Sequence, residues 1–413
     1  MKSVIINLIV GLCLSRSVLA ASDHQHEISL LSSANLSLRE VVEKTYERNP
    51  QLEVIKARLN HSEALSKSAE GLWASDPTMN ISHYNDQLMD SDGLQEWEIG
   101  MQLPLWLPGQ KAARQKTVKL QRSAINASEP ALKLEIAGIV RELLWHIALT
   151  KNRMTIAEQE WNIVLKLQQD VKKRVELGDL AQSDLILSQQ ESLSKEAIFR
   201  IARQEYVHAQ HRYDMISGLN ILPENFEEIA SDDLSITAEH PALKAFREKT
   251  NFSSAQRDQI VLEKRGNPTL FLGTRHERGI SEEGFANAIG LSISIPLGLD
   301  TYTNPKLTAA EVDLSENRSQ MEIIYRELNI AIQDASRELV AIRDQYEFAR
   351  RQNQLSKRNL AMSRKAFSLG ETSLLELIRI QAQAFAVERN VHQKHLEVGL
   401  HSARLNQAKG IIP

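Results

Sequence analysis

Two periods of hydrophobicity run through the chain, and the shorter one predicts β-strands. In one stretch of the second half, aliphatic residues alternate with small or polar ones, so that one face of the stretch is aliphatic. In the first half, residues about 77 to 85 and about 94 to 105 are predicted to pair across the turn-forming Asp-Ser-Asp-Gly run at 90–93. The aliphatic strand positions, expected to face a membrane, are Ile289, Leu291, Ile293 and Ile295.

The longer period is helical and extends over unusually long segments. Between Gly109 and Leu177 the chain has only one proline, Pro130, and one further glycine, Gly138, and residues 302–369 form a similarly long segment. At about 1.5 Å per residue, each continuous helix would be about 100 Å long. The apolar stripes are narrow, which favours coiled-coil packing against neighbouring helices. The stripe positions are Val164, Leu167, Val171 and Val175, and Leu355, Met362, Ala366 and Leu369.

The two halves of the chain repeat one another. Pro104 and Pro296, each in an aliphatic-Pro-Leu triplet, are 192 residues apart, and so are Gly178 and Gly370, each in a Leu-Gly-acid triplet. Each half reads as a helix, a hairpin, a very long helix, a glycine turn and a returning helix, which predicts a mainly α fold with a small β part. The predicted divisions are a first repeat at 37–219, a linker at 220–236 and a second repeat at 237–410.

The N-terminus has the pattern of a secretory signal peptide. Lys2 precedes an apolar stretch, and small residues stand at Val18 and Ala20, so residues 1–20 are expected to be removed. The one cysteine, Cys13, lies in this segment without the small preceding residue that lipoprotein cleavage requires. No lipid anchor, disulfide or thiolate metal site is therefore expected in the mature protein.

Composition and motifs argue against nucleic-acid binding and against catalysis. The 413 residues carry a net charge of -4, which gives no electrostatic reason to expect a nucleic acid partner. The sequence has no Gly-rich phosphate loop, no His-Glu-x-x-His and no Gly-x-Ser-x-Gly, so neither an enzyme nor a cofactor is expected. The histidine pairs His208/His211 and His392/His395 are expected to pack on helices, because two histidines do not complete a metal site.

Four strands per chain are too few to close a barrel. An open sheet edge in lipid would leave backbone groups unpaired, at several kcal/mol each. Three copies would supply twelve strands around a water-accessible lumen, so a homotrimer is expected. Aromatic residues near the strand ends would form an interfacial belt or, alternatively, pack helix on hairpin; they are Tyr84, Trp97, Trp106, Phe271 and Phe285.

This plan resembles the TolC-type outer-membrane factors. The resemblance covers about residues 37 to 410 and is carried by the duplicated order of elements, the proline triplets and the Leu-Gly turns followed by Asp184 and Glu376. It implies a trimeric twelve-stranded β-barrel in the lipid of the outer membrane, continued through the periplasm by an α-helical barrel. It also implies two partners, a periplasmic adaptor and an inner-membrane pump that supplies the energy.

The resemblance assigns roles to the helix turns. In the family the periplasmic tips meet the adaptor, so Leu177, Gly178, Leu369 and Gly370 are candidates for that contact, although helix C-capping alone also explains the glycines. Asp184 and Glu376 match positions where the family often places acidic residues at the tunnel entrance. Stabilisation of a helix N-terminus would equally select acids there.

Two classes of function remain open at this point. The first is a passive efflux conduit; the segment from Leu105 to Lys111 resembles the cation-efflux, CzcC-like branch, which works with resistance-nodulation-division pumps and heavy-metal cations. Drug efflux and type I protein secretion are alternatives within this class. The second class is a soluble periplasmic coiled-coil scaffold whose hairpins merely cap the helices.

Overall fold

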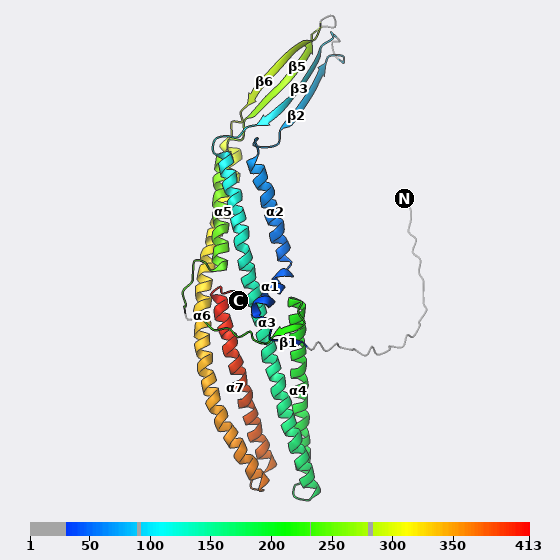
Figure 1. Cartoon of the computed structure of the whole chain (residues 1–413), viewed down its shortest axis with the longest axis vertical. Coiled ribbons are helices and arrows are strands. Elements are labelled where there is room, and N and C mark those ends of the chain that lie inside the picture. Colours follow the sequence, from blue (N-terminus) through cyan, green and yellow to red (C-terminus); the bar gives the residue numbers. More distant parts are fainter. Residues whose placement is uncertain (1–29, 89–91, 232, 280–283) are drawn as a thin grey trace, which may run out of the picture.

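The protein is an elongated rod with a β-sheet at one end (Figure 1). The computed structural model describes residues 30–88, 92–231, 233–279 and 284–413. The predicted signal peptide at 1–20 and half of the predicted turn, residues 90 and 91, lie outside these residues. The described chain is mainly helical with a small β part, as the sequence predicts.

Both halves of the described chain contain the same succession of elements. Each has a helix of intermediate length, a β-hairpin, a very long helix and a returning helix. The first half comprises α2 (Gln51–Glu70), β2 (Thr78–Asn85), β3 (Gln95–Pro104), α3 (Gln110–Glu176) and α4 (Gln182–Ser217). The second comprises α5 (Pro241–Glu263), β5 (Thr269–Arg278), β6 (Ala286–Ser294), α6 (Asp300–Ser368) and α7 (Leu374–Ala408).

The two very long helices confirm the prediction made from the scarcity of proline and glycine. Helix α3 has 67 residues and α6 has 69, so each extends about 100 Å. Helix α3 continues through Pro130 although proline cannot donate a backbone hydrogen bond. It also continues through Gly138, where a Cβ would lie 2.9 Å from the Gln407 side chain of α7, so the glycine permits close helix packing.

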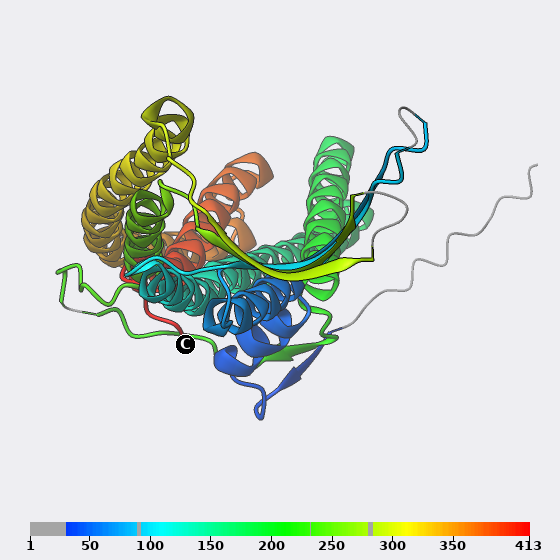
Figure 2. The same ribbon diagram turned by 90° about the horizontal axis from the view of Figure 1, so that it is seen from above.

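The helices are arranged side by side in the same order as the strands above them. In the half of the rod next to the sheet, α2 packs on α3, α3 on α5 and α5 on α6 (Figures 1 and 2). In the other half, α4 packs on α3, α3 on α7 and α7 on α6. Helix α3 therefore lies inside the layer along its whole length, whereas α6 lies at an edge.

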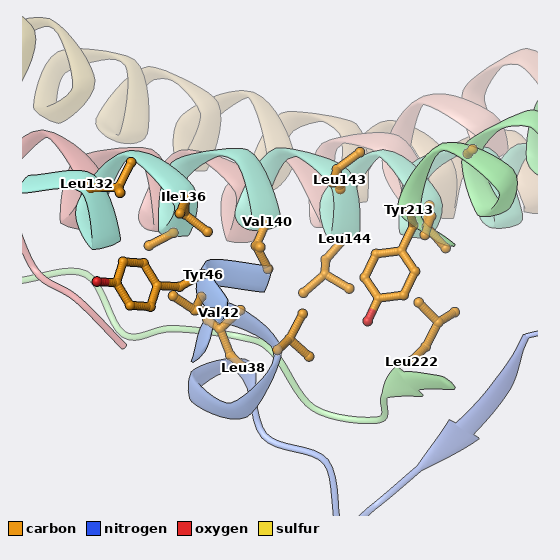
Figure 3. Packing of buried hydrophobic residues seen from close by; sticks show 14 of the residues in the cluster. Leu38, Val42, Tyr46, Leu132, Ile136, Val140, Leu143, Leu144, Tyr213 and Leu222 are labelled. Carbon is orange, nitrogen blue, oxygen red and sulfur yellow. The ribbon is translucent and has the colours of Figure 1, made fainter. Parts of the chain in front are cut away.

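The main apolar core packs a short helix against α3 (Figure 3), and this helix lies at mid-height of the rod in Figure 1. Helix α1 (Leu38–Glu47) lays Val42 and Tyr46 against Ile136 and Val140 of α3. Strands β1 (Leu31–Ser33) and β4 (Ile221–Pro223) pair in parallel beside it. The sequence did not predict α1 or this small sheet, because three-residue strands are too short to show a period of two; β4 occupies the start of the predicted linker at 220–236.

A buried ion cluster joins the two helical hairpins of the lower half. Glu160 of α3 is 2% exposed and forms ion pairs with Arg389 of α7 and, at 3.5 Å, with Lys195 of α4. By contrast, the ion pair between Glu142 of α3 and Arg404 of α7 is about half exposed on each side. Buried pairs are costly to break and exposed ones are not, so of these two contacts the one at Glu160 is expected to stabilise the helix packing more.

The C-terminal segment packs against the start of α5. His240 is 2% exposed, and its Nδ1 accepts a hydrogen bond from the backbone N–H of Ala242 at 3.2 Å. Gly410, with φ of +77°, brings the chain so close that a Cβ there would lie 2.6 Å from the imidazole. Burial lowers the pKa of His240 below its ordinary value, because the charged imidazolium loses its hydration.

The narrow apolar stripes have different surroundings on the two long helices. On α3, Val164 and Val171 are buried within the chain, as predicted for coiled-coil packing. On α6, Leu355, Met362 and Leu369 are 63 to 66% exposed, so no part of the described chain covers them. They continue a seven-residue spacing that starts at Phe348, which is also exposed.

Candidate functional site

Strands β2, β3, β5 and β6 form one antiparallel sheet in that order. The pairing register puts aliphatic residues of all four strands on one face; Ile81, Ile99 and Ile289 lie in one row. Ile289, Leu291 and Ile293 are 83%, 68% and 57% exposed, so this apolar face is uncovered within the described chain. Ile295 lies one residue beyond the end of β6. The apolar residues of this face are Met79, Ile81, Trp97, Ile99, Met101, Leu103, Leu270, Leu272, Ile289, Leu291 and Ile293, and the same face also carries His83, Thr274, His276 and Asn287.

The opposite face carries polar and small residues. Arg275 forms ion pairs with Glu96 at 2.8 Å and with Glu277 at 2.7 Å, and Glu98 lies opposite Arg275 in the register. Seen from above, the sheet is curved rather than flat (Figure 2). The polar face includes Thr78, Asn80, Ser82, Glu96, Glu98, Gly100, Gln102, Gly273, Arg275, Glu277, Ala288, Gly290, Ser292 and Ser294.

The aromatic belt candidates divide between the two faces and the base of the sheet. Trp97 lies on the apolar face, and Phe285 directly precedes β6. Tyr84 pairs with Glu96 and Phe271 pairs with Gln102, so both lie on the polar face, opposite to the expected membrane-facing residues. The sequence did not reveal this, because the face of a residue depends on strand register and not on its distance from a strand end.

Both outer strands of this sheet have open edges. Strand β2 pairs only with β3, and β6 pairs only with β5, among the residues that the structure describes. An unpaired strand edge presents a row of N–H and C=O groups that another strand can bond. Because β2 and β6 are antiparallel to their inner neighbours in a sheet of four, β6 of one copy would meet β2 of the next in antiparallel orientation.

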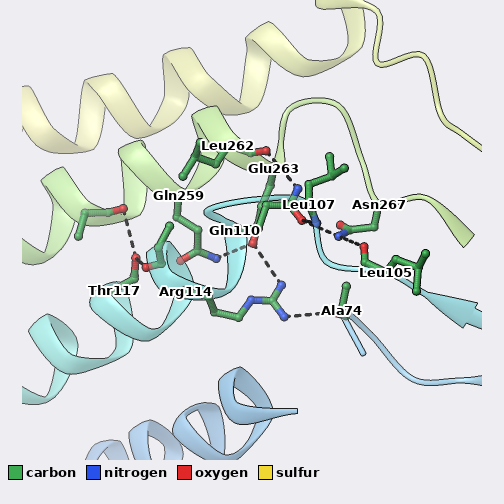
Figure 4. A network of polar contacts seen from close by, with 12 residues as sticks. Ala74, Leu105, Leu107, Gln110, Arg114, Thr117, Gln259, Leu262, Glu263 and Asn267 are labelled. Atoms are coloured by element: carbon green, nitrogen blue, oxygen red, sulfur yellow. Dashed lines mark hydrogen bonds and ion pairs between the residues drawn. The ribbon is translucent and has the colours of Figure 1, made fainter. Parts of the chain in front are cut away.

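A buried amide holds the sheet onto the helices (Figure 4). Gln110, at the first position of α3, is 0% exposed. Its Nε2 donates to the carbonyl of Leu262 at 3.1 Å, and its Oε1 accepts from the N–H of Leu107 at 3.0 Å and from Nδ2 of Asn267 at 2.6 Å. Asn267 also donates to the carbonyl of Leu105 at 2.8 Å. This network satisfies the irregular backbone where both hairpins meet their helices.

Trp106 belongs to the same junction and not to a strand. Its indole N–H donates to the carbonyl of Gly71 at 3.2 Å, and the Arg114 guanidinium lies 5.0 Å from the ring centre. Arg114 also donates to the carbonyl of Ala74 and pairs with Glu263 at 3.3 Å. No sequence pattern distinguishes Gln110, Arg114 or Asn267; the polar residues beside Pro108-Gly109 are the signal of a turn that needs side-chain partners.

The two predicted glycine turns close the far ends of the long helices. Gly178 and Gly370 have φ of +84° and +76°, a conformation in which only glycine is free of strain. At each turn the N–H of the third residue after the helix donates to a carbonyl of the last helical turn, from Asp179 to Arg174 at 2.8 Å and from Glu371 to Ala366 at 2.9 Å. Leu177 and Leu369 beside the glycines are 77% and 63% exposed, so both tips present an apolar side chain to solvent.

The two acidic candidates lie at the starts of the returning helices. The Asp184 carboxylate accepts from the N–H of Ala181 at 3.3 Å, a capping contact at the start of α4. The Glu376 carboxylate pairs with the Arg379 guanidinium at 2.6 Å, and this charge-assisted hydrogen bond lowers the pKa of Glu376. Glu376 is therefore already paired with a cation of its own helix at the start of α7.

The predicted histidine pairs do not converge on a site. All four histidines are exposed in the described chain, so the expectation that they pack on helices is not confirmed; His208 contacts Gln204, and the ring of His395 lies 5.3 Å from that of Tyr346. The described residues hold no group of three or more His, Cys, Asp or Glu that could bind a metal ion.

No helix within the described ranges combines the length and apolarity needed to cross a membrane.

The fold is that of solved outer-membrane channels. VceC from Vibrio cholerae matches with a TM-score of 0.72 at 15% identity, over 90% of this chain and 96% of that chain. The Campylobacter jejuni CmeC outer membrane channel matches with a TM-score of 0.72 at 13% identity, over 90% and 85%. The outer-membrane channel OprN matches with a TM-score of 0.73 at 16% identity, over 97% and 98%. No family model and no curated protein sequence matches this chain.

Proposed function

We propose that this chain is the outer-membrane channel of a tripartite efflux system. It works as a homotrimer of the TolC type, with a twelve-stranded barrel in the outer membrane and an α-helical barrel in the periplasm. It is a passive conduit and not an enzyme. The observation that carries the proposal is the four-stranded sheet whose two outer edges and most of whose apolar face are uncovered within the described chain.

The open edges support assembly from identical copies. In lipid no water is present to bond the free N–H and C=O groups of β2 and β6, so a partner strand must. Joining β6 of each copy to β2 of the next closes three sheets of four strands into an even, fully paired ring. The apolar face then meets lipid, and the polar face with Glu96 and Arg275 lines a water-filled lumen.

The helices support the same ring of copies. Because α6 and α4 are the edge helices of the lower half, each must meet another helix when copies stand side by side. Both carry exposed apolar residues at seven-residue spacing, Leu355 and Met362 on α6 and Ile186 and Leu193 on α4. Such stripes are the seams of coiled coils, so α6 of one copy packs on α4 of the next.

The partners and substrate follow from the same proposal. The exposed tips at Leu177 with Gly178 and at Leu369 with Gly370 dock a periplasmic adaptor, and Asp184 and Glu376 lie at the tunnel entrance. The energy comes from an inner-membrane pump, which we assign to the resistance-nodulation-division class exporting heavy-metal cations. The support for that branch is the segment from Leu105 to Lys111, and the choice between cations, drugs and proteins belongs to the pump. A deletion strain hypersensitive to copper, zinc or cobalt supports the cation assignment, and one sensitive only to drugs contradicts it.

A matched pair of cysteine variants tests the channel itself. Leu291 and Ser292 are neighbours in β6 but lie on opposite faces of the sheet. In intact cells a water-soluble maleimide should modify Ser292→Cys, in the lumen, and should leave Leu291→Cys, in lipid, unmodified until detergent is added. Equal modification of both, together with recovery of the chain in a detergent-free periplasmic extract, would instead establish the soluble coiled-coil scaffold.

A further inference from the structure

Two aromatic side chains, Tyr84 and Phe271, lie on the otherwise small and polar face of the sheet, and Phe271 is the one beside its glycines. Phe271 of β5 is on the same face as Glu96 and Arg275, the face that lines the lumen in the proposed function. The adjacent row of that face contains three glycines, Gly100, Gly273 and Gly290, paired with one another across β3, β5 and β6.

The ring of Phe271 covers these glycines. A Cβ at Gly100 would lie 2.4 Å from both Cε2 and Cζ of the ring, and a Cβ at Gly273 would lie 2.7 Å from Cζ. At Gly290 the nearest ring atom, Cε1, would be 3.9 Å away, which is ordinary contact. The far end of the ring therefore rests directly on the backbone of the row, in space that any side chain at Gly100 or Gly273 would occupy.

We infer that Phe271 sets the width of the lumen at the level of the membrane. The glycine row leaves room for its ring to lie against the sheet backbone instead of projecting into the lumen. The inference rests on the proposed function, because the polar face is a lumen only in the closed barrel. In a trimer three such rings share one level. An added side chain at Gly100 lifts the ring away from the sheet and toward the axis, because the sheet backbone lies behind it.

The test measures passage from outside the cell to a point beyond Phe271. Ser294→Cys supplies that point: it is exposed, lies on the polar face and is nearer to the helices than the glycine row. On this background, intact cells are treated with a small maleimide and with polyethylene glycol maleimides of increasing mass. The variants are Gly100→Ala, the matched control Gly290→Ala, Phe271→Ala, and the double variant of Gly100 and Phe271.

Gly100→Ala should lose modification by the larger reagents while the small one still reacts, and Gly290→Ala should behave as the parent. The double variant should regain the parent's size limit or exceed it. A Cβ at Gly100 would also lie 2.9 Å from Cα of Gly273, so a backbone distortion is the rival cause. A double variant that stays restricted, or a Gly100→Ala that matches Gly290→Ala, overturns the inference. If even the small maleimide reaches Ser294→Cys only after detergent, the proposed function fails as well.

Discussion

Replacing Gln110 with leucine tests whether the junction between sheet and helices depends on one buried amide. Leucine removes all three hydrogen bonds of the side chain and leaves the N–H of Leu107 and the carbonyl of Leu262 without their partner, while Asn267 keeps its bond to Leu105. Each unpaired buried polar group costs about 1–3 kcal/mol, so the variant should lose about 2–6 kcal/mol of stability.

The matched control is Gln115→Leu on the same helix. Gln115 is exposed and makes a single hydrogen bond, at 3.4 Å to the carbonyl of Ala69, so its loss should cost about 1 kcal/mol or less. Thermal unfolding of both purified variants in one detergent compares them. The Gln110 variant should melt clearly below the control, and equal melting temperatures would show that water or a relaxed loop replaces the amide.

Three further predictions concern the helical part. Glu160→Gln removes the buried charge that pairs with Arg389 and Lys195, although Lys195 keeps its pair with Glu191, and should cost about 3 kcal/mol of stability. Loss of the exposed pair of Glu142 in Glu142→Gln should cost about 0.5 kcal/mol, and equal melting temperatures of the two variants would contradict this. Because folding lowers the pKa of His240, its contribution to stability should be full above its unfolded pKa of about 6.5 and should fall as the pH drops below that value. His240→Asn keeps a capping side chain and should reduce the change in melting temperature between about pH 7.5 and 5. An unchanged pH dependence in this variant would show that other groups cause it. Gly370→Val forces a branched side chain into positive φ and should weaken crosslinking to the adaptor while trimers persist, and undiminished crosslinking would exclude the tip as the docking site.

The long-range plan of the fold could be predicted because it depends on periodicity and on two residue types. The absence of helix breakers between Gly109 and Leu177 is enough to predict α3, and Gly178 marks its end because no other residue adopts that φ without strain. The strand bounds near Pro104 follow from its missing N–H.

Contacts between distant segments were beyond the reach of the sequence. The face occupied by Phe271 depends on which residue of β3 it opposes, and the role of Gln110 depends on Leu262 and Asn267, more than 150 positions away. Strands β1 and β4, which pair with each other, have three residues each, so neither is long enough to show the alternation of apolar and polar residues that predicts a strand. Such features become visible only when the pairing is known.

The central claim is that open sheet edges of identical chains complete one another in the outer membrane, and disulfide crosslinking tests it most directly. The mature chain is expected to be free of cysteine, so Leu291→Cys in β6 can be combined in turn with cysteine at Met79, Ile81 or His83 on the same face of β2. Antiparallel neighbours bring Cβ atoms within reach of a disulfide at one of these positions. Oxidation of intact outer membranes should give a ladder of linked chains that ends at three, whereas monomers at every position, or a ladder that ends elsewhere, would contradict the trimeric channel.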